Sequence, residues 1–300
     1  MKTVVIAGAS GFIGTHFRRL FDDAGWQVRT VGRTGDAVWG DTTAITAVLE
    51  GADLLLNLAG KSVSCRYTPA NKAEIIRSRV ETTAELGRAL AACAHPPVDW
   101  FNASTGTIYR DARDRPQGED DGELGAGFSV EVARAWEETL AAAPAPGTRK
   151  IPLRITIAMG AGGGVMRPFN NLARLGLGGR MGDGGQKFSW VHIEDLFRAV
   201  MFLHDHPGIT GPVNIAAPEV VTNAGLMAAV RTANHVPFGL PTPAWLLRLG
   251  AVLIRTETEL VLKSRWVRAG KLADAGFEWT FPGLAGALAD IDGASIGQRS

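Results

Sequence analysis

The sequence has few cysteines and tyrosines and no clear excess of charge of either sign. Only two of its 300 residues are cysteines, Cys65 and Cys93, which are too few for a disulfide framework or a four-ligand metal site. We expect reduced thiols and no metal, and we interpret His204 and His206, which lack a third ligand, as surface residues at a helix end. The formal net charge is +1 at pH 7, without the basic stripe of a nucleic-acid-binding protein. Nucleic acid is therefore excluded as a partner.

Long hydrophobic runs are also missing. No segment approaches the roughly 18 apolar residues of a membrane-spanning helix, and the best candidate, residues 244–254, is interrupted by Arg248. The apolar run at the N-terminus is broken by glycines within residues 8–14, unlike that of a signal peptide. We expect a cytoplasmic protein without a membrane partner.

Two hydrophobic periods alternate along the first part of the chain, where short apolar runs typical of buried strands are separated by segments with helical spacing. The expected strands are 4–7, 26–31, 53–58, 98–103 and 149–157. The expected helices are 12–24, 42–49, 69–93 and 128–142. Parallel strands require crossover connections, so this order predicts an α/β fold of the Rossmann type with a doubly wound parallel sheet.

Beyond residue 160 the alternation loosens, and a glycine-rich segment, 160–185, predicts loops. We expect residues 1–160 to form the Rossmann domain. Residues 188–216, which contain two further short strands and a helix, are expected to return to it. Residues 161–187 and 217–300 are expected to form a smaller substrate lobe with a helical C-terminal segment.

A glycine-rich turn, residues 8–14, lies between the first expected strand and the first expected helix. Glycines let the backbone approach a pyrophosphate, and the start of the helix offers unpaired N–H groups and the positive end of a dipole. The alternative is a tight turn that binds nothing. The residues expected to bind a dinucleotide here are Gly8, Ser10, Gly11, Phe12, Ile13 and Gly14.

The ends of the next two strands indicate which dinucleotide is bound. An NAD site usually has Asp or Glu after the second strand, whereas an NADP site has Arg for the 2′-phosphate. Residues 31–33 contain no carboxylate and end in Arg33, which predicts NADP(H). The alternative is a solvated surface arginine. The third strand ends in Leu58, Ala59 and Gly60, where small residues suit close approach of the cofactor.

Further motifs lie along the whole chain, at residues 67–72, 78–80, 103–109, 136–137, 153–154, 162–164, 182–196, 211–214 and 276–279. The most specific is the Gln-x-x-Ser-Trp-x-His block of residues 186–192. Together they resemble the extended short-chain dehydrogenase/reductases, in particular the atypical "epimerase family" of YfcH-like and SDR39U1-like proteins. This resemblance implies a Rossmann-type NADP(H) domain and a substrate lobe, in a family of oxidoreductases and epimerases whose substrates are unassigned.

The Tyr-x-x-x-Lys pair usual in that superfamily is absent. Its tyrosine exchanges a proton with the substrate, and its lysine lowers the pKa of the tyrosine, which is otherwise about 10. The two tyrosines of this chain are Tyr67 and Tyr109, and the residues four positions later are Asn71 and Arg113. The usual proton donor therefore has no direct counterpart.

The resemblance also locates the altered positions. Anchored on Trp136, the superfamily's Tyr and Lys fall near Ser129 and Ala133, and its helix asparagine falls near Arg79. Three of the four usual catalytic positions are changed.

The fourth position is retained at the end of the fourth expected strand, where Ser104 and Thr105 match the superfamily's Ser/Thr pair. Thr105 is the better candidate for polarising a substrate oxygen and Ser104 the second; the alternative for either is a hydroxyl bonded to backbone. Tyr109 replaces the missing tyrosine if Arg79 or Lys187 supplies the positive charge; the alternative is aromatic packing.

The block at 186–192 supplies the remaining candidates. Alternation along a strand puts Phe188, Trp190 and His192 on one face. If that face lines the cleft, Trp190 supplies a wall and His192 a titratable group. The alternative for His192 is a core histidine bonded to a backbone carbonyl. Arg154 either contacts cofactor or substrate or is a buried ion-pair partner. The residues expected to contact the substrate are Gln186, Trp190, Arg79 and Lys187.

Two functions fit these residues. The first is an NADP(H)-dependent oxidoreductase or epimerase acting on a small polar carbonyl or alcohol, with the nicotinamide carrying the hydride. The second is a non-catalytic NADP(H)-binding sensor or scaffold, because the phosphate turn is intact while the catalytic pair is altered. We favour the enzyme, since the cleft retains more chemistry than a sensor needs. The superfamily also implies a homodimer through the helices at 69–93 and 128–142.

Overall fold

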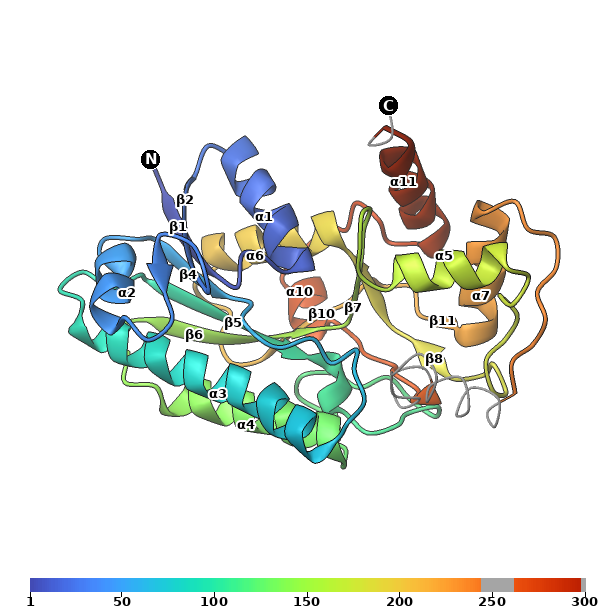
Figure 1. Ribbon diagram of the computed structural model, residues 1–300, viewed down its shortest axis with the longest axis horizontal. Helices are drawn as coiled ribbons and strands as arrows, with labels where there is room; N and C mark the ends of the chain where they lie inside the picture. Colours follow the sequence, from blue (N-terminus) through green and yellow to red (C-terminus); the bar gives the residue numbers. More distant parts are fainter. Residues whose placement is uncertain (244–261, 298–300) are drawn as a thin grey trace.

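The computed structural model describes residues 1–243 and 262–297, and a seven-stranded sheet forms its centre (Figure 1). All pairs of neighbouring strands in this sheet are parallel. The strands lie in the order β10 (Val213–Ile215), β6 (Arg149–Ile155), β5 (Asp99–Thr105), β4 (Leu54–Asn57), β1 (Thr3–Ala7), β2 (Gln27–Gly32) and β3 (Ala37–Val38). The winding reverses between β1 and β4, where such sheets open a crevice at the carboxyl ends of their strands. The predicted Rossmann-type fold is confirmed.

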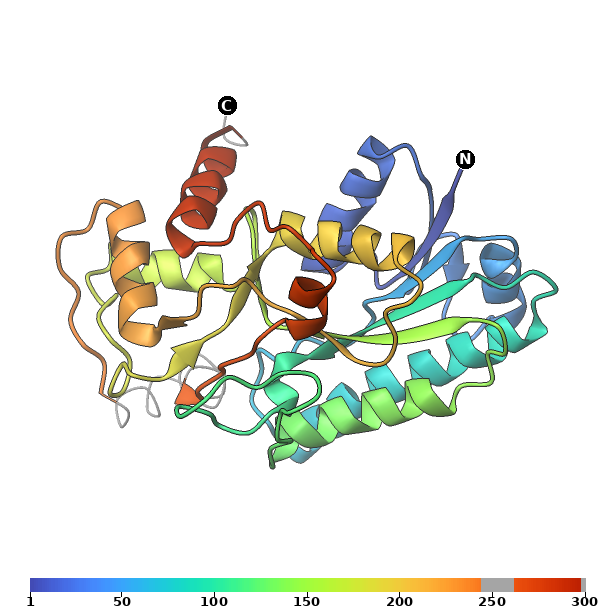
Figure 2. The same cartoon turned by 180° about the vertical axis from the view of Figure 1, so that it is seen from behind.

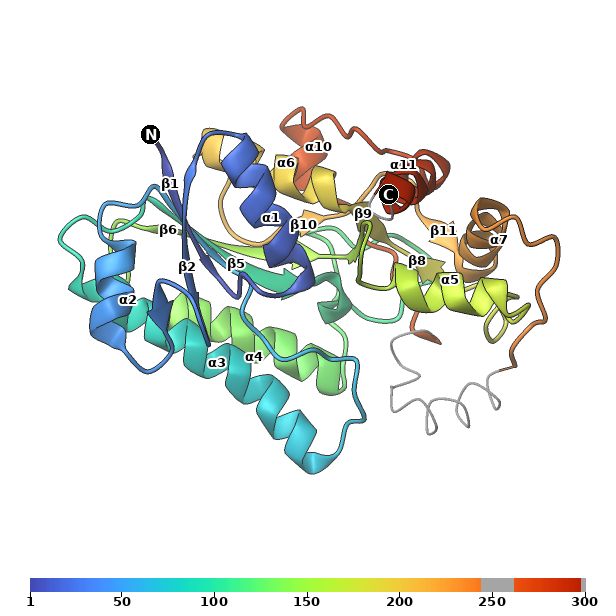
Figure 3. The ribbon, with the colours of Figure 1, turned by 45° about the horizontal axis from the view of Figure 1, so that its top comes forward.

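Helices cover both faces of the sheet (Figures 1 and 3). On one face lie α1 (Phe12–Asp23) and α6 (Ile193–Asp205), and on the other lie α2 (Thr42–Leu49), α3 (Pro69–Ala92) and α4 (Phe128–Ala142). Strand β1 shows why. Val4 belongs to the core cluster that contains Phe17 of α1, whereas Val5 belongs to the cluster that contains Ile45 of α2. Every residue of β1 is buried, as expected for a strand covered on both faces.

A smaller lobe lies at the other end of the molecule (Figure 2). Its helices are α5 (Met166–Arg174), α7 (Asn223–Ala233) and α11 (Leu284–Gly297), and its strand pairs are β8 (Lys187–Phe188) with β11 (Val221–Thr222) and β7 (Ile157–Met159) with β9 (Trp190–His192). The described part of this lobe is mainly helical, as expected. Residues 244–261, which include the apolar run 244–254, lie outside the described residues.

The glycine-rich segment at 160–185 is not all loop. It contains α5, whose Met166 and Ala173 are buried in the core of the smaller lobe. Glycines on both sides of this helix hide its periodicity in the sequence. Further short elements that the periodicity does not show are α10 (Gly270–Asp274) and the 3₁₀ turn η1 (Gly106–Ile108).

The side chain of His204 is only 8% exposed, so the interpretation of His204 as a surface residue is wrong. Its Nδ1 lies 2.7 Å from Oδ2 of Asp99, whose Oδ1 accepts a hydrogen bond of 2.6 Å from Arg149. His206 is exposed and forms the C-cap of α6. The helix end therefore joins the buried start of β5 through an ion-pair cluster. Among the residues that the structure describes, no helix has the length and apolar composition to cross a membrane.

Candidate cofactor and substrate cleft

The turn between β1 and α1 has a backbone that requires glycine. Gly8 has φ +83°, and a Cβ atom there would lie 2.7 Å from the backbone nitrogen of Ala59. Gly11 precedes α1; among the described residues no side chain caps this helix, and its first turn contains no acidic residue. Its unpaired N–H groups and positive dipole end therefore suit an anion.

A continuous cleft passes over this turn at the carboxyl ends of the strands. One part, the Arg33 arm, has a volume of about 760 Å³ and extends from Arg33 and Trp39 to Lys61. The other part, the Thr105 arm, has a volume of about 470 Å³ and extends from Lys61 to Ser104 and Thr105. The residues that line both arms are Gly8, Gly11, Leu58, Gly60, Lys61 and Ser62.

The cleft brings together the cofactor residues expected from the sequence, with the exception of Arg154. Those that line one arm or the other are Gly8, Ser10, Gly11, Phe12, Ile13, Gly14, Arg33, Leu58, Ala59 and Gly60. They converge because each segment follows a parallel strand, and the carboxyl ends of β1, β2 and β4 meet at one edge of the sheet.

The Arg33 arm has the charge expected of a phosphate site. Arg33 is exposed there, and no ion pair to it occurs within the described residues. The nearby carboxylate of Asp36 accepts hydrogen bonds of 2.7 and 2.8 Å from the backbone and hydroxyl of Thr30, and it lines a separate hollow. A guanidinium rather than a carboxylate therefore follows β2 in this arm, and the two carboxylates that also line the arm, Glu74 and Glu81, are paired with Arg77 of the same helix.

Two hydroxyls at the end of β5 line the Thr105 arm, but they are oriented differently. Ser104 donates a hydrogen bond of 2.6 Å to Oε1 of Glu137. Thr105 accepts one of 3.1 Å from the backbone of Thr107, which leaves its own proton for another acceptor. Thr105 is therefore the hydroxyl that can donate to a bound oxygen.

Arg79 of α3 also lines the Thr105 arm, as one of the expected substrate contacts. Its Nη1 donates hydrogen bonds of 3.0 Å to the backbone carbonyls of Lys61 and Ile75, and its guanidinium carbon lies 4.9 Å from the ring centre of Trp136. Burial lowers the pKa of Arg79 to about 10, which neighbouring Tyr67 partly offsets. The group stays charged at neutral pH.

Three lining residues were not among the candidates from the sequence. Tyr67 lines the Thr105 arm, with its ring edge-on to Phe128 at a centroid distance of 4.8 Å. Lys61 lines both arms and donates a hydrogen bond of 3.0 Å to Asn71. Ser129 stands near the superfamily's tyrosine position, and its Oγ is buried without a hydrogen-bond partner among the described residues. No periodicity in the sequence distinguishes the loop at 60–68 as part of a cleft.

Tyr109 lies outside the cleft lining, in the core of the Rossmann domain. It is 2% exposed, and its hydroxyl donates to Oδ1 of Asn214 and accepts from Arg154, at 2.9 Å in each case. Arg154 binds both carboxylate oxygens of Glu137, at 2.9 and 2.8 Å. The structure thus places Tyr109 in packing and Arg154 in a buried ion pair, which are the alternatives that the sequence left open. Burial raises the pKa of Tyr109, although Arg154 partly opposes this.

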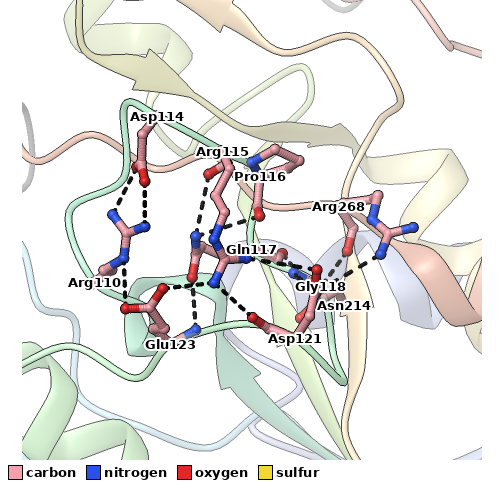
Figure 4. A network of polar contacts seen from close by, with 10 residues as sticks. All are labelled: Arg110, Asp114, Arg115, Pro116, Gln117, Gly118, Asp121, Glu123, Asn214 and Arg268. Carbon is pink, nitrogen blue, oxygen red and sulfur yellow. Dashed lines mark hydrogen bonds and ion pairs between the residues drawn. The ribbon is translucent and has the colours of Figure 1, made fainter.

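The loop after Tyr109 is held by a network of charged side chains (Figure 4). Arg110 donates to both oxygens of Asp114, and Arg115 donates a hydrogen bond of 2.6 Å to Glu123. Beneath them the buried Gln117 accepts a hydrogen bond of 2.7 Å from the backbone of Glu123. The network fixes the loop over the core and does not line the cleft.

The block at 186–192 joins the smaller lobe to the sheet and does not line the cleft. Trp190 is fully buried in the core of the lobe, and Gln186 donates a hydrogen bond of 3.0 Å to the carbonyl of Met181. The ammonium of Lys187 lies 4.6 Å from the ring centre of Trp266. The expected substrate contacts at these positions are therefore not brought together with Arg79.

His192 has a structural position in the same block. It is 1% exposed, and its Nδ1 accepts a hydrogen bond of 3.3 Å from the backbone of Glu194, which caps α6. Its Nε2 lies 3.3 Å from Oδ2 of Asp290. Burial lowers the pKa of His192, with a smaller opposing effect from Asp290.

The parallel sheet and the cleft at its carboxyl edge define a Rossmann-type α/β protein. Residues 4–216 match the model of the NAD dependent epimerase/dehydratase family, and residues 242–291 match a domain of unknown function, DUF1731. The chain therefore belongs to the NAD dependent epimerase/dehydratase family.

Known relatives support this assignment over nearly the whole chain. The chain is similar to the epimerase family protein SDR39U1 of Bos taurus, with 32% identity over 96% of this chain and 99% of the relative. It is 27% identical to the epimerase family protein YfhF of Bacillus subtilis, over 96% of this chain and 97% of the relative. The crystal structure of human SDR39U1 (isoform 2) with NADPH superimposes with a TM-score of 0.88 and 29% identity, over 97% of this chain and 99% of that chain. The resemblance seen in the sequence is confirmed.

Proposed function

We propose that this protein is an NADP(H)-dependent oxidoreductase or epimerase that acts on a small polar carbonyl or alcohol. The observation that carries the proposal is the continuous cleft, which joins the glycine turn and Arg33 at one end to Thr105 at the other. The similar human protein crystallised with NADPH supports the choice of cofactor.

The residues of the Arg33 arm fit this cofactor. The backbone at Gly8 and Gly11 and the first turn of α1 would hold the diphosphate, and Arg33 would hold the 2′-phosphate. When bound, the nicotinamide supplies the hydride. Thr105 donates a hydrogen bond to the substrate oxygen and polarises it. Tyr67 is the tyrosine that lines the Thr105 arm, and we assign to it the proton exchange with that oxygen.

The first experiment measures cofactor affinity with the full chain. NADPH should bind at least about 10-fold more tightly than NADH, and Arg33→Ser should remove most of this preference, because a charge-assisted phosphate contact is lost. Arg19→Gln is the matched control, since Arg19 is exposed on α1 and does not line the cleft. A protein that takes up neither dinucleotide would contradict the proposal.

A second experiment tests catalysis. Oxidation of NADPH is followed while the protein is supplied with mixtures of small aldehydes, ketones and sugars. Thr105→Val and Tyr67→Phe should each reduce turnover by about 100-fold or more while NADPH affinity stays the same. Turnover unchanged in both variants would show that this assignment of residues is wrong.

A non-catalytic NADP(H)-binding sensor or scaffold is the second candidate. It is favoured by the positions of Ser104 and Tyr109, because both hydroxyls already donate to acceptors within the fold, Glu137 and Asn214 respectively. Tight binding of NADPH without oxidation by any substrate mixture would favour this candidate over the enzyme.

We also propose that the protein is a cytoplasmic homodimer. The support is by analogy with the superfamily, whose dimers use the two helices that correspond to α3 and α4. These helices lie side by side over one face of the sheet (Figure 3). Light scattering after size exclusion should give twice the chain mass of 31.8 kDa. A single-chain mass at all concentrations would contradict the dimer.

A further inference from the structure

The charged side chains that line the Thr105 arm are all positive within the described residues. The charged residues that line it, within the part of the chain that the structure describes, are Lys61 and Arg79, and both are cations. The remaining lining is aromatic, aliphatic or hydroxylated, and its aromatic members are Phe12, Tyr67, Phe128 and Trp136. A neutral carbonyl compound does not require two cations beside it.

The guanidinium of Arg79 is held in place by its contacts with Gly60 and Trp136. A Cβ atom on Gly60 would lie 2.9 Å from the guanidinium carbon, so the glycine lets the guanidinium rest against the backbone at the end of β4. On α4, Trp136 presents its ring to the same guanidinium, and its indole N–H is fixed by a hydrogen bond of 3.0 Å to Thr83. The side chain is therefore ordered before any ligand arrives, which reduces the entropy lost on binding.

The guanidinium of Arg79 retains hydrogen-bonding capacity. It has five N–H donors, and its acceptors among the described residues are the backbone carbonyls of Lys61 and Ile75, both of which bind Nη1. No carboxylate among the described residues pairs with it, and burial without such a partner lowers its pKa. Partly buried cations are normally paired, because desolvation is otherwise uncompensated. An anionic ligand in the arm would supply the partner.

Ser129 provides a second, independent donor in the same arm. It lines the cavity on the face of α4 that also carries Val132 and Trp136, at spacings of three and seven residues. Its buried Oγ has no hydrogen-bond partner among the described residues. A buried hydroxyl without a partner is unfavourable unless a ligand or water bonds to it.

We propose that Arg79, with Lys61 and Ser129, forms a subsite for an oxyanion, so that the substrate carries a carboxylate or phosphate group close to its carbonyl or alcohol. The inference rests on the proposed function for the reacting end at Thr105. It narrows the substrate from any small polar carbonyl or alcohol to an organic acid or a phosphate ester.

The test measures binding of small probes by calorimetry to the full chain saturated with NADPH, so that the cofactor's own phosphate sites are filled. Oxamate is compared with neutral oxamide, and glycerol 3-phosphate with neutral glycerol. At least one anion should bind about 10-fold or more tightly than its neutral counterpart. The two pairs distinguish a carboxylate from a phosphate.

Substitutions then locate the effect. Arg79→Gln should remove the preference for the anion and leave NADPH affinity unchanged. Arg88→Gln, an exposed arginine on the same helix outside the cleft, is the matched control and should retain the preference. If Arg79→Gln fails to fold, Lys61→Gln and Arg79→Lys are used in its place. Each of them should lower the binding affinity for the anion by about 3- to 10-fold.

The outcomes separate this inference from the proposed function. Equal affinity for anion and neutral probe, or a preference that survives in Arg79→Gln, overturns the subsite. A loss of NADPH affinity in Arg79→Gln also overturns the subsite, because it would show that Arg79 binds the cofactor. Failure of the wild-type chain to bind NADPH instead counts against the proposed function.

Discussion

Arg79 and Arg154 make similar contacts with an aromatic ring but differ in their electrostatic surroundings. Each guanidinium lies over an aromatic ring, 4.9 Å from the centre of Trp136 and 5.2 Å from that of Tyr109 respectively. Burial by itself acts to lower the pKa of each arginine. For Arg154 the hydrogen bonds and the charge of Glu137 more than offset this effect, so its pKa is raised. For Arg79 only Tyr67 opposes burial, and its effect is smaller, so the pKa of Arg79 is lowered.

The difference separates a structural cluster from a binding site. Behind the end of β5, the groups of Arg154, Glu137 and Tyr109 are hydrogen-bonded to one another, and a ligand has nothing to add. Within the cleft, Arg79 and Thr105 keep donors that the fold does not use. Four predictions test this contrast, from the largest expected effect to the smallest.

Arg154→Met should have the largest effect on stability. It leaves the carboxylate of Glu137, which is 14% exposed, with the hydroxyl of Ser104 but without its cationic partner, and breaking such a pair costs about 3 to 5 kcal/mol of the free energy of unfolding. Urea unfolding of the wild type and the variant measures this. The double variant Arg154→Met/Glu137→Leu should recover a large part, because no unpaired charge remains. A loss below about 1 kcal/mol would place Arg154 in the same class as Arg79.

Asp99→Asn should lower the free energy of unfolding by about 2 kcal/mol at neutral pH, through lost charged hydrogen bonds from Arg149 and His204. Burial opposes ionisation of Asp99, but these hydrogen bonds outweigh it and its pKa is lowered. A lowered folded-state pKa stabilises the fold above the ordinary value of about 3.9, and this stability is lost as the pH falls through the folded-state value.

The difference between wild type and Asp99→Asn should therefore shrink in acid, below about pH 4. Urea unfolding over a pH series checks this, with the exposed Asp120→Asn as the control. A difference that grows with acidity would contradict the assignment of the charge.

Tyr109→Phe and Tyr67→Phe should have opposite consequences. Tyr109→Phe removes hydrogen bonds to Arg154 and Asn214, so stability should fall by about 1 to 2 kcal/mol while NADPH affinity and turnover persist. Tyr67→Phe should lower turnover with a smaller effect on stability. Unfolding curves and NADPH oxidation rates of both variants show the two effects. If Tyr109→Phe loses turnover while its fold stays intact, Tyr109 and not Tyr67 is the proton donor.

Arg79→Met should change the free energy of unfolding least, by less than about 1 kcal/mol, and in the stabilising direction if at all. The substitution removes a charge whose burial no carboxylate compensates and keeps an apolar side chain against Trp136. Thermal unfolding in the absence of ligand measures it. Destabilisation as large as that of Arg154→Met would show that Arg79 is a structural residue.

The fold and the Arg33 arm were largely readable from the sequence. Buried parallel strands are short apolar runs, so their number and order follow from composition and spacing. Residues that follow parallel strands lie at one edge of the sheet, which is why the glycine turn, Arg33 and residues 58–60 converge as expected. The helix α5 was missed because neighbouring glycines obscure its period.

The Thr105 arm was only partly readable. The sequence offers two tyrosines with equal chemistry, and nothing in their spacing shows that Tyr67 lines the cleft while Tyr109 is buried. The block at 186–192 was read as cleft lining because its residue types suit catalysis. Its strand instead buries Trp190 in the core of the smaller lobe and His192 at the start of α6.

The sequence by itself determined the class of fold, the phosphate turn and the cation at its far end, because these depend on local backbone conformation and on hydrophobic periodicity. Only the tertiary structure decided which arginine is neutralised and which retains free donors. Arg154 meets Glu137 across 17 residues, and Arg79 meets Trp136 of another helix. Such pairings depend on how helices and strands pack. Packing brings together residues that are distant in the sequence, so no local sequence pattern predicts their contact.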